Sequence, residues 1–302
     1  MKPCKDQSMR VTPIARILSL MGLCAAAAWA VADEPGLPLW EVGIGAAAYH
    51  QPNYPGSDVR STTAFPFPYV IYRGDFFRID RNLQGILYET QRLKVDFSAG
   101  ATSLVESDKS DARAGMSDLD PTIEVGPAVS LLLSDPDRPD NLWGRLAVRK
   151  AYSVDTGDWD FTPQGWIFDA KLRYQRPLIG ETLRLSTEIG ASFADSDYLG
   201  YFYDVPSRYS TPERPAFGSG SGYAGARLGL GLNGALGQWR WSVYGAYLNL
   251  GGAAFTGSPL LESRHDFSVG ATLAWMFWRS ERRVLPKNTS PGSEFDAPLI
   301  GF

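Results

Sequence analysis

Cysteine is almost absent from this sequence: only Cys4 and Cys24 occur among its 302 residues. Both lie before Ala32, where an export signal would be cleaved, so the exported chain would contain no thiol. A chain without thiols forms no disulfide and offers no cysteine nucleophile or thiolate metal ligand. Histidine is also scarce, because the exported chain would hold only His50 and His265.

The first 32 residues have the order of a secretory signal. Four basic residues are followed by an apolar run over residues 17–28, and either Ala30-Val31-Ala32 or Ala28-Trp29-Ala30 fits an A-x-A cleavage site. The apolar run is too short to span a membrane comfortably. The residue before Cys24 is too large for lipoprotein processing. We therefore predict a signal peptide over residues 1–32.

Long hydrophobic runs and a positive net charge are both missing. No later stretch reaches the roughly 18 consecutive apolar residues of a membrane-spanning helix. The formal net charge is −4, from 29 Lys and Arg against 33 Asp and Glu. Loss of residues 1–32 removes four bases and one acid, which makes it −7. An acidic chain argues against nucleic acid as a partner.

What the sequence does contain is regular alternation of apolar and polar residues. It is clearest over residues 165–193, where two runs are separated by a break at Pro177–Gly180. A period of two indicates a β-strand with one apolar and one polar face. Long strands of this kind in an exported chain are typical of a barrel whose apolar side faces lipid.

The same pattern predicts an all-β fold, an antiparallel up-and-down transmembrane β-barrel of about 12 strands, with ten strands as the rival count. The predicted strands cover residues 39–50, 62–72, 75–80, 83–90, 93–104, 119–133, 142–153, 164–176, 182–193, 221–235, 238–250 and 265–278. Short turns alternate with longer connections, which is the asymmetry of outer-membrane barrels. The predicted organisation is a signal peptide over 1–32, a barrel over 33–278 and a flexible periplasmic tail over 279–302.

Two prolines conflict with the second predicted strand. Pro66 and Pro68 cannot donate a backbone hydrogen bond to a neighbouring strand. We interpret residues 65–69 as a bent or bulged end of that strand.

The polar faces of the strands place charges of both signs inside the barrel. Unpaired charges in a narrow interior are costly, so cross-strand pairs such as Arg149–Asp169 and Lys171–Glu188 are expected. Paired charges would fill the interior, whereas a water-filled interior with a surplus of bases would favour anions. The predicted inward charges are Lys94, Asp96, Glu124, Arg145, Arg149, Asp169, Lys171, Arg173, Arg184, Glu188, Arg227 and Arg240.

The two histidines are weak candidates for a metal site. His50 ends the first strand and His265 begins the last, and barrel closure makes these strands neighbours. We favour two polar rim residues over a metal or catalytic cluster. A lipid hydrolase would need a serine and a histidine on the lipid-facing rim, but the alternation turns Ser268 inward. No catalytic residue, cofactor or metal is therefore predicted.

The apolar faces of the last strands predict contact with lipid acyl chains. An aromatic row of this kind is more often a lipid contact than a ligand site. The predicted lipid-facing residues are Trp239, Trp241, Leu273, Trp275 and Phe277.

One stretch resembles a known family. Residues 42–58 read VGIGAAAYHQPNYPGSD and are followed by a Tyr72-Arg73-Gly74 turn. This is similar to the MipA/OmpV family of outer-membrane proteins, and the motif loop consists of Tyr54, Pro55, Gly56, Ser57 and Asp58. From the residues alone, this loop is a Pro-Gly turn whose Ser and Asp bond to local backbone.

The resemblance implies a bacterial outer-membrane barrel without catalysis. It implies a scaffold that brings a murein lytic transglycosylase together with a penicillin-binding protein, in contact with outer-membrane lipid. No catalytic residues follow from it. A small-solute, anion-leaning, porin-like channel remains the alternative, and the state of the interior charges distinguishes the two.

Overall fold

The computed structural model describes residues 36–284, apart from 75–76, 81, 156 and 181. The predicted signal peptide and residues 285–302 of the predicted tail lie outside the described residues.

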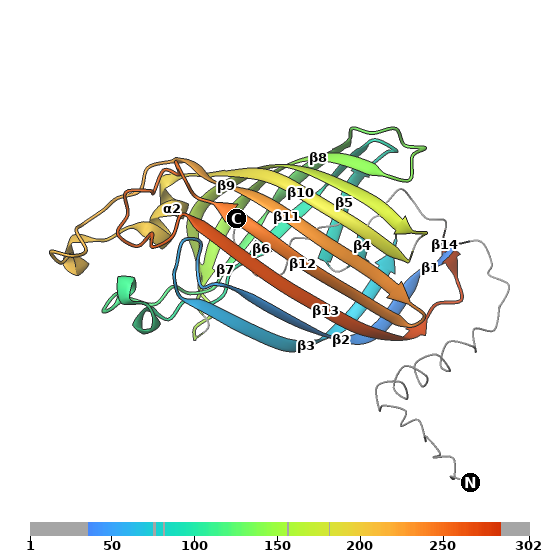
Figure 1. Cartoon of the computed structure of the whole chain (residues 1–302), viewed down its shortest axis with the longest axis horizontal. Coiled ribbons are helices and arrows are strands. Elements are labelled where there is room, and N and C mark those ends of the chain that lie inside the picture. The colour runs from blue at the N-terminus through green and yellow to red at the C-terminus, as the bar shows by residue number, and fades with distance from the viewer. Residues whose placement is uncertain (1–35, 75–76, 81, 156, 181, 285–302) are drawn as a thin grey trace, which may run out of the picture. The chain divides into compact units, whose positions relative to one another are not determined.

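Twelve antiparallel strands close into a barrel (Figure 1). Each strand pairs with its neighbours in chain order, and the last strand pairs with the first. The predicted up-and-down barrel of twelve strands is confirmed. The strands are β2 (Trp40–Pro52), β3 (Arg60–Arg73), β4 (Phe77–Asp80), β5 (Asn82–Glu89), β6 (Leu93–Ala101), β7 (Thr122–Leu132), β8 (Asn141–Val154), β9 (Phe161–Ile179), β10 (Leu183–Ala194), β11 (Gly222–Leu236), β12 (Trp239–Asn249) and β13 (His265–Arg279).

The period-two sequence pattern explains why these segments are strands. In β9, burial alternates along the chain, with Ile167 and Asp169 buried and Trp166 and Phe168 exposed. One face of the sheet therefore turns polar groups to the interior, and the other presents apolar groups to the surroundings.

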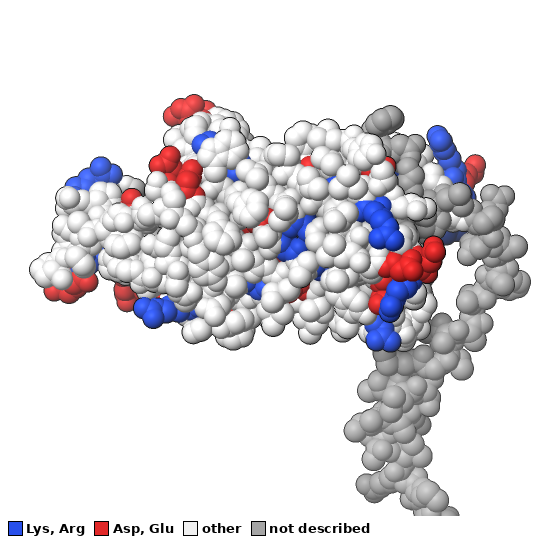
Figure 2. All heavy atoms as spheres, turned by 90° about the horizontal axis from the view of Figure 1, so that it is seen from above, with Lys and Arg blue, Asp and Glu red and all other residues white. Residues whose placement is uncertain are grey.

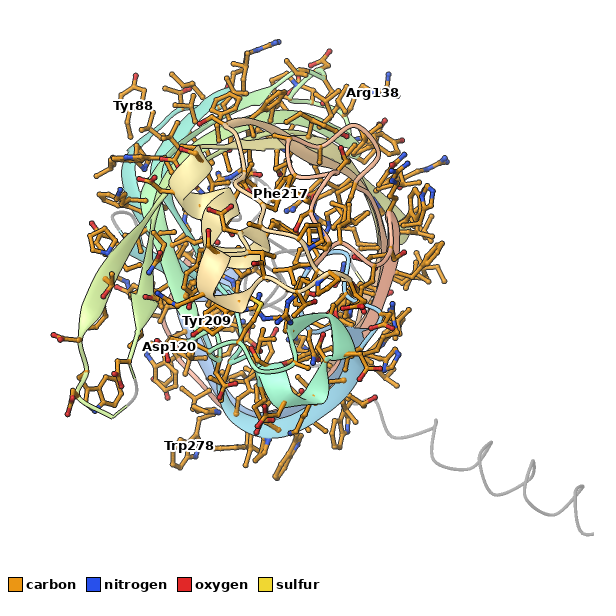
Figure 3. All side chains as sticks on the ribbon, turned by 90° about the vertical axis from the view of Figure 1, so that its left-hand side faces the viewer. Tyr88, Asp120, Arg138, Tyr209, Phe217 and Trp278 are labelled. Atoms are coloured by element: carbon orange, nitrogen blue, oxygen red, sulfur yellow. The ribbon has the colours of Figure 1, made fainter. Side chains whose placement is uncertain are left out.

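The two ends of the barrel differ. At the long-loop end lie the connections 53–59, 102–121, 155–160, 195–221 and 250–264, while the short-turn end has tight connections apart from residues 133–140. Helix α2 (Ser196–Tyr203) lies within the long-loop end. Viewed into that end, α2 and Phe217 lie across the ring of strands, whereas Tyr88 and Trp278 point away from it (Figure 3). No helix in the described part of the chain is long and apolar enough to cross a membrane.

At the short-turn end, two short strands join the beginning and end of the described chain. β1 (Leu37–Pro38) pairs with β14 (Arg283–Val284). Leu39 N donates to Arg282 O at 2.8 Å, and Ser280 N donates to Trp40 O at 2.9 Å. The barrel therefore extends to Arg279, and the described beginning of the predicted flexible tail is hydrogen-bonded.

Pro66 and Pro68 lie inside a regular strand, so the predicted bend at residues 65–69 is wrong. β3 pairs with β2 along its whole length, including Ala46–Pro66 and Ile44–Pro68. Its other edge pairs with β4 only at residues 71–73 in the described part of the chain. Proline is tolerated here because this part of β3 is an edge strand.

Candidate functional site

The interior of the barrel holds the charged residues. None of the twelve predicted inward residues is exposed, and they come from seven consecutive strands, β6 to β12. Lys94, Asp96, Glu124, Asp169 and Glu188 are each at most 2 % exposed. Their charges must therefore be compensated by partners inside the barrel.

Arg149 forms the centre of the first charge cluster. Its Nε donates to Glu124 Oε2 at 2.9 Å, and its Nη2 lies 2.6 Å from Asp169 Oδ2. Ser192 Oγ donates to the other oxygen of Asp169 at 2.5 Å. The predicted Arg149–Asp169 pair is therefore present, within a network that joins strands β7 to β10.

A second cluster lies closer to the short-turn end. Lys94 Nζ lies 3.2 Å from Asp96 Oδ2, and Arg145 Nη2 donates to Asp96 Oδ1 at 2.9 Å. Arg145 also donates to Ser130 Oγ at 2.8 Å. Two cations therefore share one carboxylate on strands β6 to β8.

The third cluster joins Arg173 to Glu188, whereas the Lys171–Glu188 pair stays a prediction. The register places Arg173 directly opposite Glu188 and Lys171 opposite Gly190. Arg173 Nε donates to Glu188 Oε2 at 3.0 Å. The pairing of β10 with β9 is continuous from Arg184 to Ala194, so this alignment holds along nearly the whole of β10.

Glu41 was not among the predicted inward charges. It lies on β2, beside the seam where β2 pairs with β13 and closes the barrel. It is 5 % exposed and accepts from Arg73 Nη2 at 2.7 Å and from Arg240 Nη2 at 3.0 Å. The three residues belong to β2, β3 and β12. Of the other predicted charges, Arg184 is half-buried on β10 and Arg227 lines a cavity described below.

The long loops form a plug in their end of the barrel. We define the plug as the buried cluster that α2 and loops 53–59, 102–121 and 250–264 contribute at this end. Tyr203 of α2 stacks on Phe255 with ring centroids 3.7 Å apart. Leu199 and Phe202 are also buried. Their apolar burial stabilises the closed arrangement of the loops.

Helix α2 is held in place by polar contacts at its N-terminal turn. Asp195 accepts from Tyr198 N at 3.0 Å, which caps the helix. Tyr198 Oη donates to Glu124 Oε1 at 2.8 Å and so ties the plug to the first charge cluster. Burial raises the pKa of Tyr198 well above its ordinary value, so the phenol keeps this proton.

The motif loop belongs to the plug and is more than a local turn. Ser57 Oγ accepts from Val59 N, as a local turn predicts. However, Tyr54 is 2 % exposed and donates to Leu260 O at 2.8 Å. Gly56 N donates to Asp266 Oδ2 at 2.5 Å, and Tyr203 Oη donates to Pro55 O at 2.6 Å.

Gly56 cannot be replaced easily, because its φ is +88° and a Cβ there would lie 2.2 Å from Leu261 Cδ1. Asp58 is exposed, and its backbone N–H donates to Glu262 at 3.2 Å. The Tyr-Pro-Gly-Ser-Asp sequence therefore joins two loops across the barrel seam.

A small cavity of about 30 Å³ lies beneath the motif loop. Its lining includes Tyr54, Phe202, Arg227, Asp266 and Ser268. This volume has room for about two water molecules. Ser268 lines this interior cavity, on the opposite face of β13 from His265.

The histidines do not gather acidic or histidine ligands. His50 Nδ1 contacts Thr62 Oγ1 at 2.9 Å, and Arg60 Nε donates to His50 Nε2 at 3.2 Å. His265 Nδ1 contacts Tyr247 Oη at 2.7 Å. In the described residues, no group of three or more His, Cys, Asp or Glu residues could hold a metal ion.

The outer face of the barrel is apolar. Trp239, Leu273, Trp275 and Phe277 are exposed there, and Trp241 is half-buried over Gly234. In the view of Figure 2, most charged side chains gather toward the two ends of the barrel. An apolar band between polar ends is the surface that a bilayer requires.

These features define a bacterial outer-membrane β-barrel whose interior carries ion-pair clusters and, at one end, the plug. The family described as MltA-interacting protein MipA matches residues 44–277, and the chain belongs to that family.

Two curated outer-membrane proteins are similar to part of the chain. Omp26La of Vibrio anguillarum is 32 % identical over 91 residues, and OmpV of Vibrio cholerae is 31 % identical over 91 residues. Each match covers 29 % of this chain and spans about a third (34 %) of the relative.

Solved structures are more distant. The translocator domain of the autotransporter NalP from Neisseria meningitidis is 10 % identical, with a TM-score of 0.39 over 87 % of this chain and 97 % of that chain. An outer membrane channel from Pseudomonas putida F1 is 12 % identical, with a TM-score of 0.35 over 82 % and 100 %. Scores this low establish neither a shared ligand nor a shared activity.

Sequence reasoning missed the residues that carry the plug. Arg113 is 2 % exposed in a predicted loop and donates to Phe202 O at 3.1 Å. Tyr198, Leu199, Phe202 and Tyr203 follow the i, i+1, i+4, i+5 spacing of one helical face. That spacing could have predicted the helix from the sequence, but it extends over only two turns.

Proposed function

We propose that this chain is a non-enzymatic scaffold of the outer membrane that binds peptidoglycan-remodelling enzymes at its short-turn, periplasmic end. The observation that carries the proposal is the arrangement of the interior, in which the plug lies at the long-loop end and paired charges line strands β6 to β10. A barrel that conducts little can still present a fixed surface to periplasmic partners. The description of the family as an MltA-interacting protein supports a lytic transglycosylase as one partner.

The ordered segment around β14 is the best candidate for the docking surface. Arg279 and Arg282 are exposed beside the β1–β14 pair, whose backbone hydrogen bonds hold this segment at the barrel end. Basic groups on an ordered segment favour an acidic partner surface and accelerate its association at low salt.

A binding experiment tests the scaffold. The protein in lipid nanodiscs is mixed with a murein lytic transglycosylase and a penicillin-binding protein from the same bacterium, and affinity is measured at low and high salt. Arg279→Glu with Arg282→Glu should weaken binding at least about tenfold, as expected for reversal of two interface charges. Arg138→Glu, on another turn at the same end, is the matched control. Absence of binding by the unaltered protein would remove the scaffold proposal.

A small-solute channel is the second candidate, because bases outnumber acids among the predicted inward residues. Bilayer recordings should find the unaltered protein nearly silent. Replacement of residues 196–218 by a short Gly-Ser linker should give a small, anion-leaning conductance. A large conductance from the unaltered protein would favour the channel over the scaffold. Lipid hydrolysis by the refolded protein would overturn the non-enzymatic assignment.

A further inference from the structure

The wall of the barrel is joined weakly on both sides of the β4–β5 hairpin. β3 pairs with β4 through Ile71–Asp80, Tyr72–Ile79 and Arg73–Arg78. Among the described residues, β5 pairs with β6 only from Ile86 to Glu89. By contrast, every residue of β2 pairs with β3. The short hairpin therefore joins its neighbours only toward the short-turn end.

Two strand edges are left beside this hairpin. Residues 60–68 of β3 pair with β2, and residues 97–101 of β6 pair with β7. No strand in the described part of the chain pairs with the other edge of either segment. We call this part of the wall, between residues 60–68 and 97–101, the β3–β6 opening.

The sequence of β3 protects this edge against another strand. Pro66 and Pro68 have no N–H groups, yet the ladder with β2 continues through both positions. Their backbone nitrogen atoms therefore point toward the opening, away from the hydrogen bonds with β2. Prolines on an edge discourage addition of a strand from a second protein. A second copy of the chain or a partner strand is thus a poor occupant.

The interior beside the opening is aromatic. Phe65 and Phe67 have ring centroids 6.1 Å apart, and Phe67 and Tyr69 follow at 5.7 Å. Tyr49 of β2 packs edge-on against Phe65 at 6.2 Å. We call these four residues the aromatic row.

Small residues beneath the row leave space for the rings. Phe67 lies opposite Gly45, and Tyr69 lies opposite Gly43. Phe65 and Phe67 remain half-exposed on the inner face. The charge clusters described above are on β6 to β10 and at the short-turn end, so this stretch of β3 offers an apolar surface.

The surroundings of the β3–β6 opening indicate which kind of molecule enters it. The outer face next to the opening carries exposed Pro66, Pro68 and Phe97, so acyl chains surround it. We propose that one acyl chain of a membrane lipid enters through the β3–β6 opening and lies along the aromatic row. The polar head of that lipid and interior water satisfy the strand edges, whose backbone groups are costly to leave in hydrocarbon. The proposal of this lipid site does not rest on the proposed scaffold function.

A labelling experiment tests the site, because the chain has no cysteine after Cys24. Single cysteines at Phe65→Cys, Thr272→Cys and Ala64→Cys are labelled with a fluorophore in vesicles of brominated phospholipid. Phe65 and Thr272 both face inward and both lie opposite Ala47 of β2, which makes them a matched pair. Ala64 is exposed on the outer face and reports direct lipid contact.

We expect brominated chains to quench the label at residue 65 nearly as strongly as at residue 64, and to spare residue 272. Quenching at residue 65 by aqueous iodide alone would overturn the proposal, as would equal protection of residues 65 and 272. Thr63→Cys, also inward on β3, replaces Phe65→Cys if that variant does not fold. Because no enzyme partner is present, failure here leaves the scaffold experiment unaffected.

Discussion

The interior wall has two halves with different chemistry. Strands β6 to β10 carry buried ion pairs centred on Asp96, Arg149 and Glu188. Strands β11 to β13, β2 and β3 carry mostly small and aromatic inward residues, such as Gly45 and Phe67. The first half is held by buried ion pairs, and the second is held by the packing of these side chains, apart from the Glu41 ion pairs at its short-turn end. The charged half should therefore be rigid, whereas the aromatic half can admit a ligand.

The plug is attached differently to each half. Tyr198 donates to Glu124 in the charged half, whereas Gly56 donates to Asp266 on β13. A change in one half should therefore loosen one attachment and spare the other. The following substitutions separate the two.

The largest effect should come from Arg149→Met. The change leaves Glu124 and Asp169 as neighbouring buried carboxylates without their shared cation, which should cost about 3–5 kcal/mol of unfolding free energy. Urea unfolding of the protein in vesicles measures it. Arg138→Gln is the control, because Arg138 is exposed and surface ion pairs such as the one it forms with Asp140 contribute about 0–1 kcal/mol. Equal effects of the two changes would mean that the charged half does not depend on its ion pairs.

Tyr198→Phe should have the next largest effect. It removes the hydrogen bond to Glu124 and keeps the ring, so we expect a loss of about 2 kcal/mol, typical of a bond to a charged group. Proteolysis of loop 195–221 should accelerate, while the 53–59 loop stays protected. Simultaneous cleavage of both loops would show that the plug is a single unit.

Gly45→Ala tests the aromatic half. The added Cβ would lie 2.9 Å from Phe67 Cζ, so the ring must shift at a cost of about 1 kcal/mol. Gly245→Ala is the matched control, because its nearest neighbours would be 3.9 Å away. An unchanged unfolding midpoint for Gly45→Ala would mean that the aromatic row is loosely packed.

The smallest effect should be a pH dependence of the motif loop. Partial burial, reinforced by the neighbouring Asp58, raises the pKa of Glu262 from 4.5 to about 7. A raised pKa stabilises the folded loop fully below the ordinary value, and this stabilisation is lost as pH rises through about 7. Amide exchange at Ser263, corrected for intrinsic rates, should increase between about pH 5 and about pH 8. Glu262→Gln should abolish this increase, and a persistent increase would assign it to another group.

Much of the wall could be predicted because a period of two is a long-range constraint. Once one residue of a strand faces lipid, the alternation places every other residue, and all twelve predicted charges are on the inner side. The residue opposite Glu188 was harder to predict. It is Arg173, and the alternation fixes which face a residue occupies without fixing which residue of the next strand lies opposite it.

The plug could not be derived from local pattern. Its contacts join residues far apart in the chain, such as Tyr54 with Leu260 and Tyr203 with Pro55. The prolines of β3 are a different case. Pro66 and Pro68 indicated from the sequence that this strand is unusual. The reason is that this part of β3 is an edge strand, which only the pairing of the neighbouring strands reveals.

The pairing of Leu37 with Val284 has a consequence for the order of the chain. Paired residues in neighbouring strands are close enough for a short peptide linker. A circular permutant that joins these residues and opens at the exposed turn near Arg138 should therefore form the same ring of strands. The barrel would then have no obligatory first strand, and its topology would be a property of the closed sheet.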